Sequence, residues 1–218
     1  MEKTKALYSK GEEIFNGVTH IIGGGLGILF LIFACIYGGL KLNSLQTISL
    51  IVYSISMIVL YTMSTLYHMI SHTVAKKVFR ILDHCTIYFL IAGTYTPYII
   101  LGIPSINGYI VLLIEWLLAI IGITFNAINM NWKAVKILSY ISYVVMGWCI
   151  VIIFNELIKI NPVSLWLLLA GGICYTGGFI FYGIGKIKKW FHSIWHIFVL
   201  LGTICHFISV IFLMINCW

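Results

Sequence analysis

The chain has 218 residues, of which 61% are hydrophobic and only 9% are charged. A soluble domain has about 45–50% apolar and about 25% charged residues, and a chain of this length cannot bury so much apolar surface. The composition therefore excludes a water-soluble globular protein and indicates a membrane protein. The net charge of +7 does not indicate nucleic-acid binding, because the basic residues lie in short clusters between apolar runs.

Seven apolar runs are long enough to cross a bilayer, since a spanning helix needs about 20 mostly apolar residues. We expect an all-α membrane protein, a single seven-transmembrane helix bundle that takes up residues 1–218. In chain order the expected spans are approximately 17–40, 44–70, 82–103, 108–128, 134–154, 163–185 and 191–215. The six cysteines include no Cys-x-x-Cys pair, so we expect neither a disulfide framework nor a thiolate metal site.

The basic residues predict the orientation of the bundle. Of the 13 Lys and Arg residues, 11 fall in the N-terminal tail or in the loops after the second, fourth and sixth spans. The positive-inside rule places these segments in the cytosol, and the odd number of spans places the C-terminus outside. We therefore expect a multi-pass protein of the cell membrane, plasma or inner, whose partners are lipids. No obligate protein partner is evident, and the sequence does not predict an oligomeric state.

Ionisable residues inside membrane spans are costly, so each is a candidate functional residue. His68 ends the second span, Asp83 is expected to open the third, and His192 and His196 begin the seventh. The predicted orientation puts all four near the cytosolic face. The orientation is derived from the loop charges alone. The common depth of these four residues is therefore independent support for a shared site.

The spacing of His192 and His196 favours a metal site. Residues four apart lie on one face of a helix, and this spacing supplies two ligands in helical zinc sites. With His68 they would form a three-nitrogen site that leaves one position open for water, the arrangement of catalytic rather than structural zinc. Imidazole also suits copper, iron and nickel, so the residues do not identify the metal.

Two further residues could carry chemistry beside this site. Ser64 lies one turn before His68, so its hydroxyl could reach a bound water or a developing oxyanion. Asp83 could accept a proton from that water, or orient a histidine. The simpler alternatives are that Asp83 caps the third helix, that Ser64 packs between helices, and that the histidines lie among lipid headgroups.

A second polar stripe begins the first span. Glu13, Asn16 and His20 are spaced i, i+3 and i+7, so they share one helix face. They could form an interfacial edge or support the metal site by hydrogen bonds. His206 lies ten residues beyond His196, about 15 Å deeper, so we expect it to be hydrogen-bonded within the bundle and not to bind the same metal.

The order of these motifs resembles the haemolysin III family, the short bacterial branch of the progestin and adipoQ receptor family. The resemblance covers essentially the whole chain and rests on Glu13-x-x-Asn16-x-x-Thr19-His20, Ser64-x-x-x-His68, Leu82-Asp83-His84 and His192-x-x-x-His196. It implies a zinc ion (Zn²⁺) near the cytosolic face, held by His68, His192 and His196, with Ser64 and Asp83 as the matching family residues. The wider superfamily includes the alkaline ceramidases, which hydrolyse lipid amides.

These observations leave several functions open. The leading hypothesis is a zinc-dependent intramembrane hydrolase of a lipid amide or ester, with Asp83 as general base and Ser64 stabilising the oxyanion. A receptor-like or membrane-homeostasis protein with a structural zinc is the first alternative. A pore-forming haemolysin or cytolysin, as the family name implies, is the second. A bis-histidine haem protein is disfavoured, because His206 has no evident partner at its depth.

Overall fold

The computed structural model describes residues 8–215, which contain no β-strand. Over this range seven helical segments are long and apolar enough to span a membrane, as the sequence predicts. The elements are α1 Lys10–Lys41, α2 Ser44–Met69, α3 Thr73–Pro97 with the π-helix η1 Tyr98–Gly102, α4 Ile106–Asn129, α5 Lys133–Trp148 with the 3-10 helix η2 Cys149–Ile153 and the short α6 Phe154–Leu157, α7 Pro162–Ile184, and α8 Phe191–Ile215. Lys3, Lys5 and Trp218, which enter the predicted orientation, lie outside the described residues.

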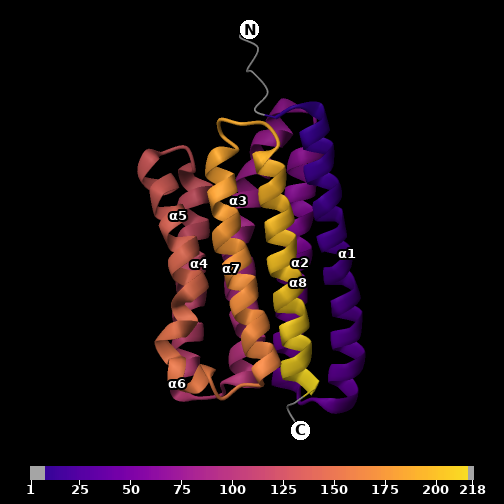
Figure 1. Ribbon diagram of the computed structural model, residues 1–218, viewed down its shortest axis with the longest axis vertical. Helices are drawn as coiled ribbons and strands as arrows, with labels where there is room; N and C mark the ends of the chain where they lie inside the picture. Colours follow the sequence, from indigo (N-terminus) through magenta and orange to yellow (C-terminus); the bar gives the residue numbers. More distant parts are fainter. Residues whose placement is uncertain (1–7, 216–218) are drawn as a thin grey trace.

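The helices form an up-and-down bundle in which chain neighbours pack side by side (Figure 1). α8 closes the bundle by packing on both α7 and α1, while α4 and α5 lie at the other side. α3 is the central helix, since 72% of its most apolar stretch is buried, against 22% in α5 and α7. The beginning of α1 and the end of α8 lie at opposite ends of the bundle, as an odd number of spans requires (Figure 1).

Two helices begin earlier than the apolar runs predict. α1 begins at Lys10 rather than near residue 17, because the Ser9 side chain and Glu12 form a capping box that satisfies the first amides. α3 begins at Thr73 rather than near residue 82, with the His72 ring accepting from the Ala75 amide. The segment from residue 73 to residue 80, which the sequence assigns to the loop between the second and third spans, is therefore helical.

The fifth span is not one regular helix. The Tyr95 hydroxyl donates to the Met146 carbonyl at 2.6 Å and accepts from the Ile150 amide at 2.8 Å. In an α-helix these two backbone groups would bond to each other. The inserted hydroxyl therefore interrupts the ladder, a recognised cause of helix distortion, and η2 follows at this point.

Two glycines of α1 allow this helix to approach α2 closely. A Cβ at Gly23 would lie 2.5 Å from the Tyr61 ring, and one at Gly27 would lie 2.9 Å from Ile58. α1 and α2 can therefore pack at short range, which holds the polar stripe of α1 against the end of α2.

Candidate metal centre

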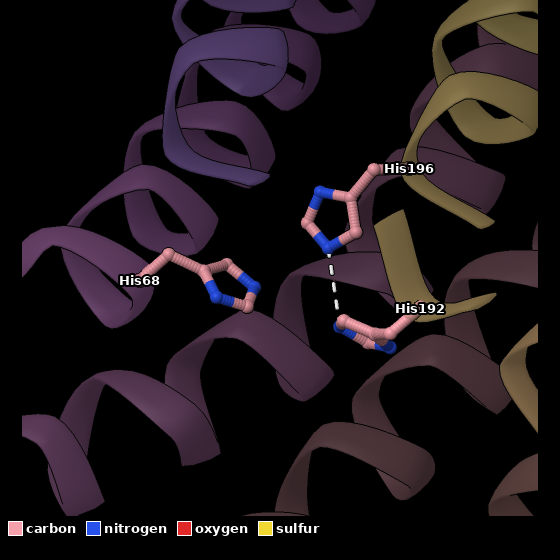
Figure 2. Close-up of side chains that lie close together, drawn as sticks. All are labelled: His68, His192 and His196. Carbon is pink, nitrogen blue, oxygen red and sulfur yellow. Dashed lines mark hydrogen bonds between the residues drawn. The ribbon is translucent and has the colours of Figure 1, made fainter. Parts of the chain in front are cut away.

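Three histidines from two helices meet at one end of the bundle (Figure 2). His68 lies in the last turn of α2, and His192 and His196 lie in the first two turns of α8. One nitrogen of each ring lies within 4.8 Å of the other two, and all three residues are buried. We call this end, defined by His68, His192 and His196, the histidine end. The residues that the sequence places at one depth are therefore brought together.

The geometry fits a metal ion. Zinc binds imidazole at about 2.0–2.1 Å, which separates neighbouring nitrogens of a tetrahedral site by about 3.3 Å. The Nε2 atoms of His192 and His196 are 3.2 Å apart, so one ion could bind both without a change of helix geometry. His68 Nε2 is buried without a hydrogen-bond partner, a costly state that a bound cation would relieve. These three residues could hold a metal, whose identity the geometry does not establish.

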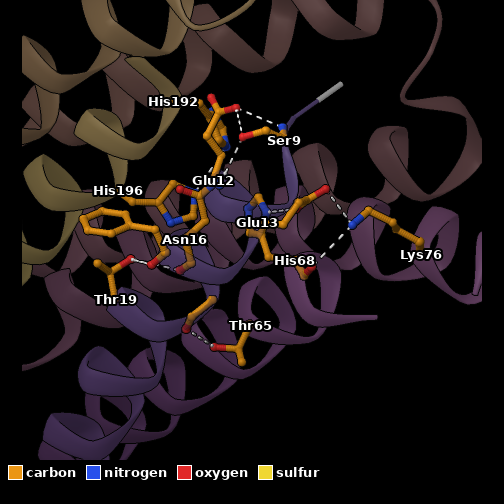
Figure 3. A network of polar contacts seen from close by, with 12 residues as sticks. Ser9, Glu12, Glu13, Asn16, Thr19, Thr65, His68, Lys76, His192 and His196 are labelled. Atoms are coloured by element: carbon orange, nitrogen blue, oxygen red, sulfur yellow. Dashed lines mark hydrogen bonds and ion pairs between the residues drawn. The ribbon is translucent and has the colours of Figure 1, made fainter. Parts of the chain in front are cut away.

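Glu13 orients His68 (Figure 3). Its Oε2 lies 2.6 Å from His68 Nδ1, and its Oε1 forms an ion pair with the Lys76 ammonium at 2.8 Å. A carboxylate on one imidazole nitrogen fixes the tautomer and leaves the other nitrogen free for a metal. The Glu13 side chain therefore makes the contact expected of a supporting residue.

The other two residues of the stripe face the same site without hydrogen bonds from their side chains. The His20 ring lies 3.9 Å from the His196 ring, centroid to centroid, and both His20 nitrogens are buried and unpartnered. The Asn16 amide is fully buried and also has no partner. The stripe thus lies inside the bundle against α8, which contradicts the alternative of an interfacial edge.

Ser64 and Asp83 form a pair beside the histidines. Ser64 is 1% exposed and lies one turn before His68, and its hydroxyl hydrogen-bonds to the Asp83 carboxylate. Asp83 does not lie at the start of its helix, because it is ten residues beyond Thr73, in the third turn of α3. The alternative that Asp83 caps the helix is excluded, because His72 has that position.

A single cavity connects these groups. It has a volume of about 510 Å³, and Ser64, Asp83, His192 and His196 contribute to its wall. Most of the remaining lining consists of apolar and aromatic side chains of α2, α3, α5, α7 and α8, including Leu60, Ile87, Ile91, Val144, Leu168 and Val199. His206 lies on the same wall, and its Nε2 bonds the Leu168 carbonyl at 3.1 Å, the hydrogen bond expected within the bundle. The cavity is therefore polar beside the histidines, and most of its remaining wall is apolar or aromatic.

Sequence reasoning missed two residues that hold the N-terminal segment over the site. The Tyr8 ring stacks on His192 with centroids 4.4 Å apart. Burial raises the pKa of the Tyr8 hydroxyl above its usual range, so this group remains a hydrogen-bond donor. Glu12 accepts from the Trp190 amide at 2.6 Å, and Trp190 has the left-handed φ of 68°. The capping spacing of Ser9 and Glu12 could have indicated the helix start, but not these distant contacts.

The comparisons with known proteins agree with this architecture. A family model described as "Haemolysin-III related" matches residues 8–207. The chain belongs to the haemolysin III family. It is 41% identical over 202 residues to "Hemolysin-3" of Bacillus cereus, which covers 92% of this chain and 91% of the relative. It is 39% identical to the "Hemolysin-3 homolog" of Bacillus subtilis, with 94% and 96% covered.

A more distant relative is the "Monocyte to macrophage differentiation factor" of Homo sapiens. It is 26% identical over 193 residues, which cover 83% of this chain and 79% of the relative. The range matched to the haemolysin III family begins at Tyr8 and extends past His196. Every residue of the candidate metal centre in this haemolysin III protein therefore lies within the matched part of the chain.

Proposed function

We propose that this haemolysin III family protein is a zinc-dependent hydrolase of a lipid amide or ester. The observation that carries the proposal is the cluster of His68, His192 and His196 beside the Ser64–Asp83 pair, on the wall of an apolar cavity. A zinc ion on three imidazoles keeps one open position, polarises a carbonyl and lowers the pKa of a bound water towards about 7. The protein's own groups would supply proton transfer and binding.

Asp83 is the proposed general base. Its carboxylate lies on the cavity wall and accepts the Ser64 hydroxyl, so it is already oriented towards the space that a substrate carbonyl would occupy. When Asp83 takes a proton it becomes a weaker acceptor and can release the Ser64 hydroxyl. The freed hydroxyl can then donate to a developing oxyanion, a contribution that typically stabilises a transition state by several kcal/mol, about 2.7–4 in a measured case.

The proposed location follows from the loop charges. With the clusters of Lys and Arg in the cytosol, the histidine end lies at the inner face of the cell membrane. A lipid of the inner leaflet could then place its polar group beside Asp83 and its chains along the apolar part of the cavity. Membrane lipids are therefore the proposed partners and substrates.

Two other functions remain candidates. The histidines join α2 to α8, so a metal there would also clamp the bundle, as expected for a homeostatic membrane protein with a structural zinc. The name of the Bacillus cereus relative suggests cytolysis. Ion conductance by the purified protein in liposomes would favour a pore over the proposed hydrolase.

The hydrolase proposal is tested by turnover of fluorogenic lipid amides and esters by the purified protein in nanodiscs. Asp83→Asn should reduce turnover by at least about 100-fold, because it removes the base but none of the three imidazoles. Metal content, measured on the same samples, should stay unchanged. Full activity of this variant, or no turnover of any lipid by metal-loaded wild type, would contradict the proposal.

A further inference from the structure

Three cationic side chains from different segments line the cavity that contains Asp83. They are Arg80 of α3, Lys136 of α5 and Lys186, which follows α7. On α5, Lys136 lies one turn before Tyr140, whose ring contacts the Lys186 ammonium. On α3, Arg80 lies one turn before His84, whose carbonyl accepts from Tyr143 of α5 at 2.9 Å, so the three cations lie around one part of the wall. This cationic mouth, defined by Arg80, Lys136 and Lys186, lies beside the proposed catalytic groups because Arg80 is one turn before Asp83.

The positive charge of the cationic mouth is not balanced by protein carboxylates. Among the described residues that line the cavity, Asp83 is the single acid. Neither of the two ion pairs found in residues 8–215 involves the three cations. The Lys186 ammonium instead lies over the Tyr140 and Tyr182 rings, 4.7 and 4.8 Å from their centroids. Three cations thus face one carboxylate, which already has the Ser64 hydroxyl as a partner.

The remaining acids of the described chain have other partners or lie away from the cavity. Glu115, in α4, does not line it. Glu12 accepts from Ser9 and Trp190, and Glu13 binds His68 and Lys76. Glu156 accepts from Asn107, which follows the loop at residues 103–105, at the end of the bundle away from the histidines. Asp83 is therefore the one described carboxylate on the cavity wall, and its single charge does not balance three cations, so an external anion could do so.

The shape of the site restricts the chemistry of that anion. A guanidinium fork and two ammonium groups suit the oxygens of a phosphate, which forms charge-assisted hydrogen bonds with both. The apolar lining beyond them suits acyl chains. We propose that the cavity binds a glycerophospholipid with an anionic phosphate headgroup, and that the cationic mouth selects it over neutral lipids such as ceramides or diacylglycerols.

The expected hydrolysis of this lipid rests on the proposed function, whereas its expected binding does not. The ester carbonyls of a glycerophospholipid are a few bonds from its phosphate, so a headgroup at Arg80 would bring an ester near Asp83. Hydrolysis there would break the acyl carbon–oxygen bond. Water would supply the hydroxyl of the released fatty acid and the proton of the glycerol oxygen.

The experiment measures binding of fluorescently labelled phosphatidate and of diacylglycerol with the same chains. The full-length protein is held in nanodiscs of neutral phosphatidylcholine. Wild type should prefer phosphatidate by about tenfold or more, and the variant R80Q/K136Q/K186Q should lose that preference. The matched control K77Q/K133Q/K188Q removes three exposed lysines that do not line the cavity, and it should keep the preference.

Each result decides the inference. Equal affinity of wild type for the two lipids would overturn it, and so would an equal loss in the control, which would indicate general attraction to a basic surface. Displacement of phosphatidate by soluble glycerol phosphate at similar concentration would overturn the lipid assignment. Asp83→Asn should still bind phosphatidate selectively, so a failed hydrolase proposal and a failed binding proposal give different results.

Discussion

Glu13 and Glu115 are both acidic residues within apolar helices, yet their surroundings differ. Glu13, at the histidine end, contacts His68 at 2.6 Å and Lys76 at 2.8 Å. Glu115, in α4, is fully buried, and the polar group beside its carboxyl is the weakly donating Cys149 thiol. The comparison teaches that a buried acid indicates a site only when other groups converge on it. Glu13 contacts His68, one of three clustered histidines, whereas the structure gives Glu115 no such surroundings.

The largest expected effect at the histidine end is that of His68→Ala. This variant removes the one ligand that α2 contributes, so metal affinity should fall by more than the roughly 10–100-fold cost of losing a supporting residue. A competition titration with a chelator of known affinity measures the change. Unchanged affinity would mean that the metal is held by α8 and other groups. The contrast between Glu13, which contacts His68, and Glu115 would then have no bearing on metal binding.

Glu13→Gln should lower metal affinity by about 10–100-fold, because His68 would lose the carboxylate that fixes its tautomer. The same chelator titration applies, and Glu115→Gln is the matched control, since it makes the same chemical change in a buried acid of another helix. The control should bind metal as wild type does. Equal losses in both variants would show that the effect comes from general destabilisation.

Glu12→Gln should have a smaller effect on the metal. The substitution weakens the charge-assisted hydrogen bond to the Trp190 amide, which holds the turn before His192. We expect a loss of stability of about 1–2 kcal/mol and a severalfold loss of metal affinity. Thermal unfolding and the chelator titration measure the two effects. A stability equal to that of wild type would mean that this contact does not hold the turn.

Glu115→Gln should have the smallest effect. Because its oxygens have only the weak Cys149 thiol beside them and form no ion pair among the described residues, the amide should change the free energy of unfolding by less than about 1 kcal/mol, or stabilise the protein. Unfolding in mixed micelles is the measurement. A large destabilisation would mean that Glu115 has a charged role, and the contrast with Glu13 would no longer hold.

The sequence predicts the seven spans well because each has an apolar run of the required length. It misplaces the starts of α1 and α3, because these depend on caps at Ser9 and His72 rather than on hydrophobicity. The error matters for Asp83, which lies well inside α3. Hydropathy locates the apolar part of a helix but does not detect a polar first turn.

The three histidines could be predicted as a group, because His192 and His196 share a helix face and the loop charges give His68 the same depth. The contacts of Tyr8 with His192 and of Glu12 with Trp190 could not. The same is true of the cationic mouth, whose Lys136 and Lys186 are read from sequence only as cytosolic loop charges. Such contacts depend on how α1, α5 and α7 pack, which no local pattern encodes.

Metal analysis of the purified protein tests the central claim most directly. Elemental analysis of wild type should find about one zinc per chain, as expected for a site of three imidazoles, and none in a His192→Ala, His196→Ala double variant. The variant should be compared at equal purity and after confirming its helical content. Absence of any metal from the wild type, or an equal content in both proteins, would contradict the account of the histidine end.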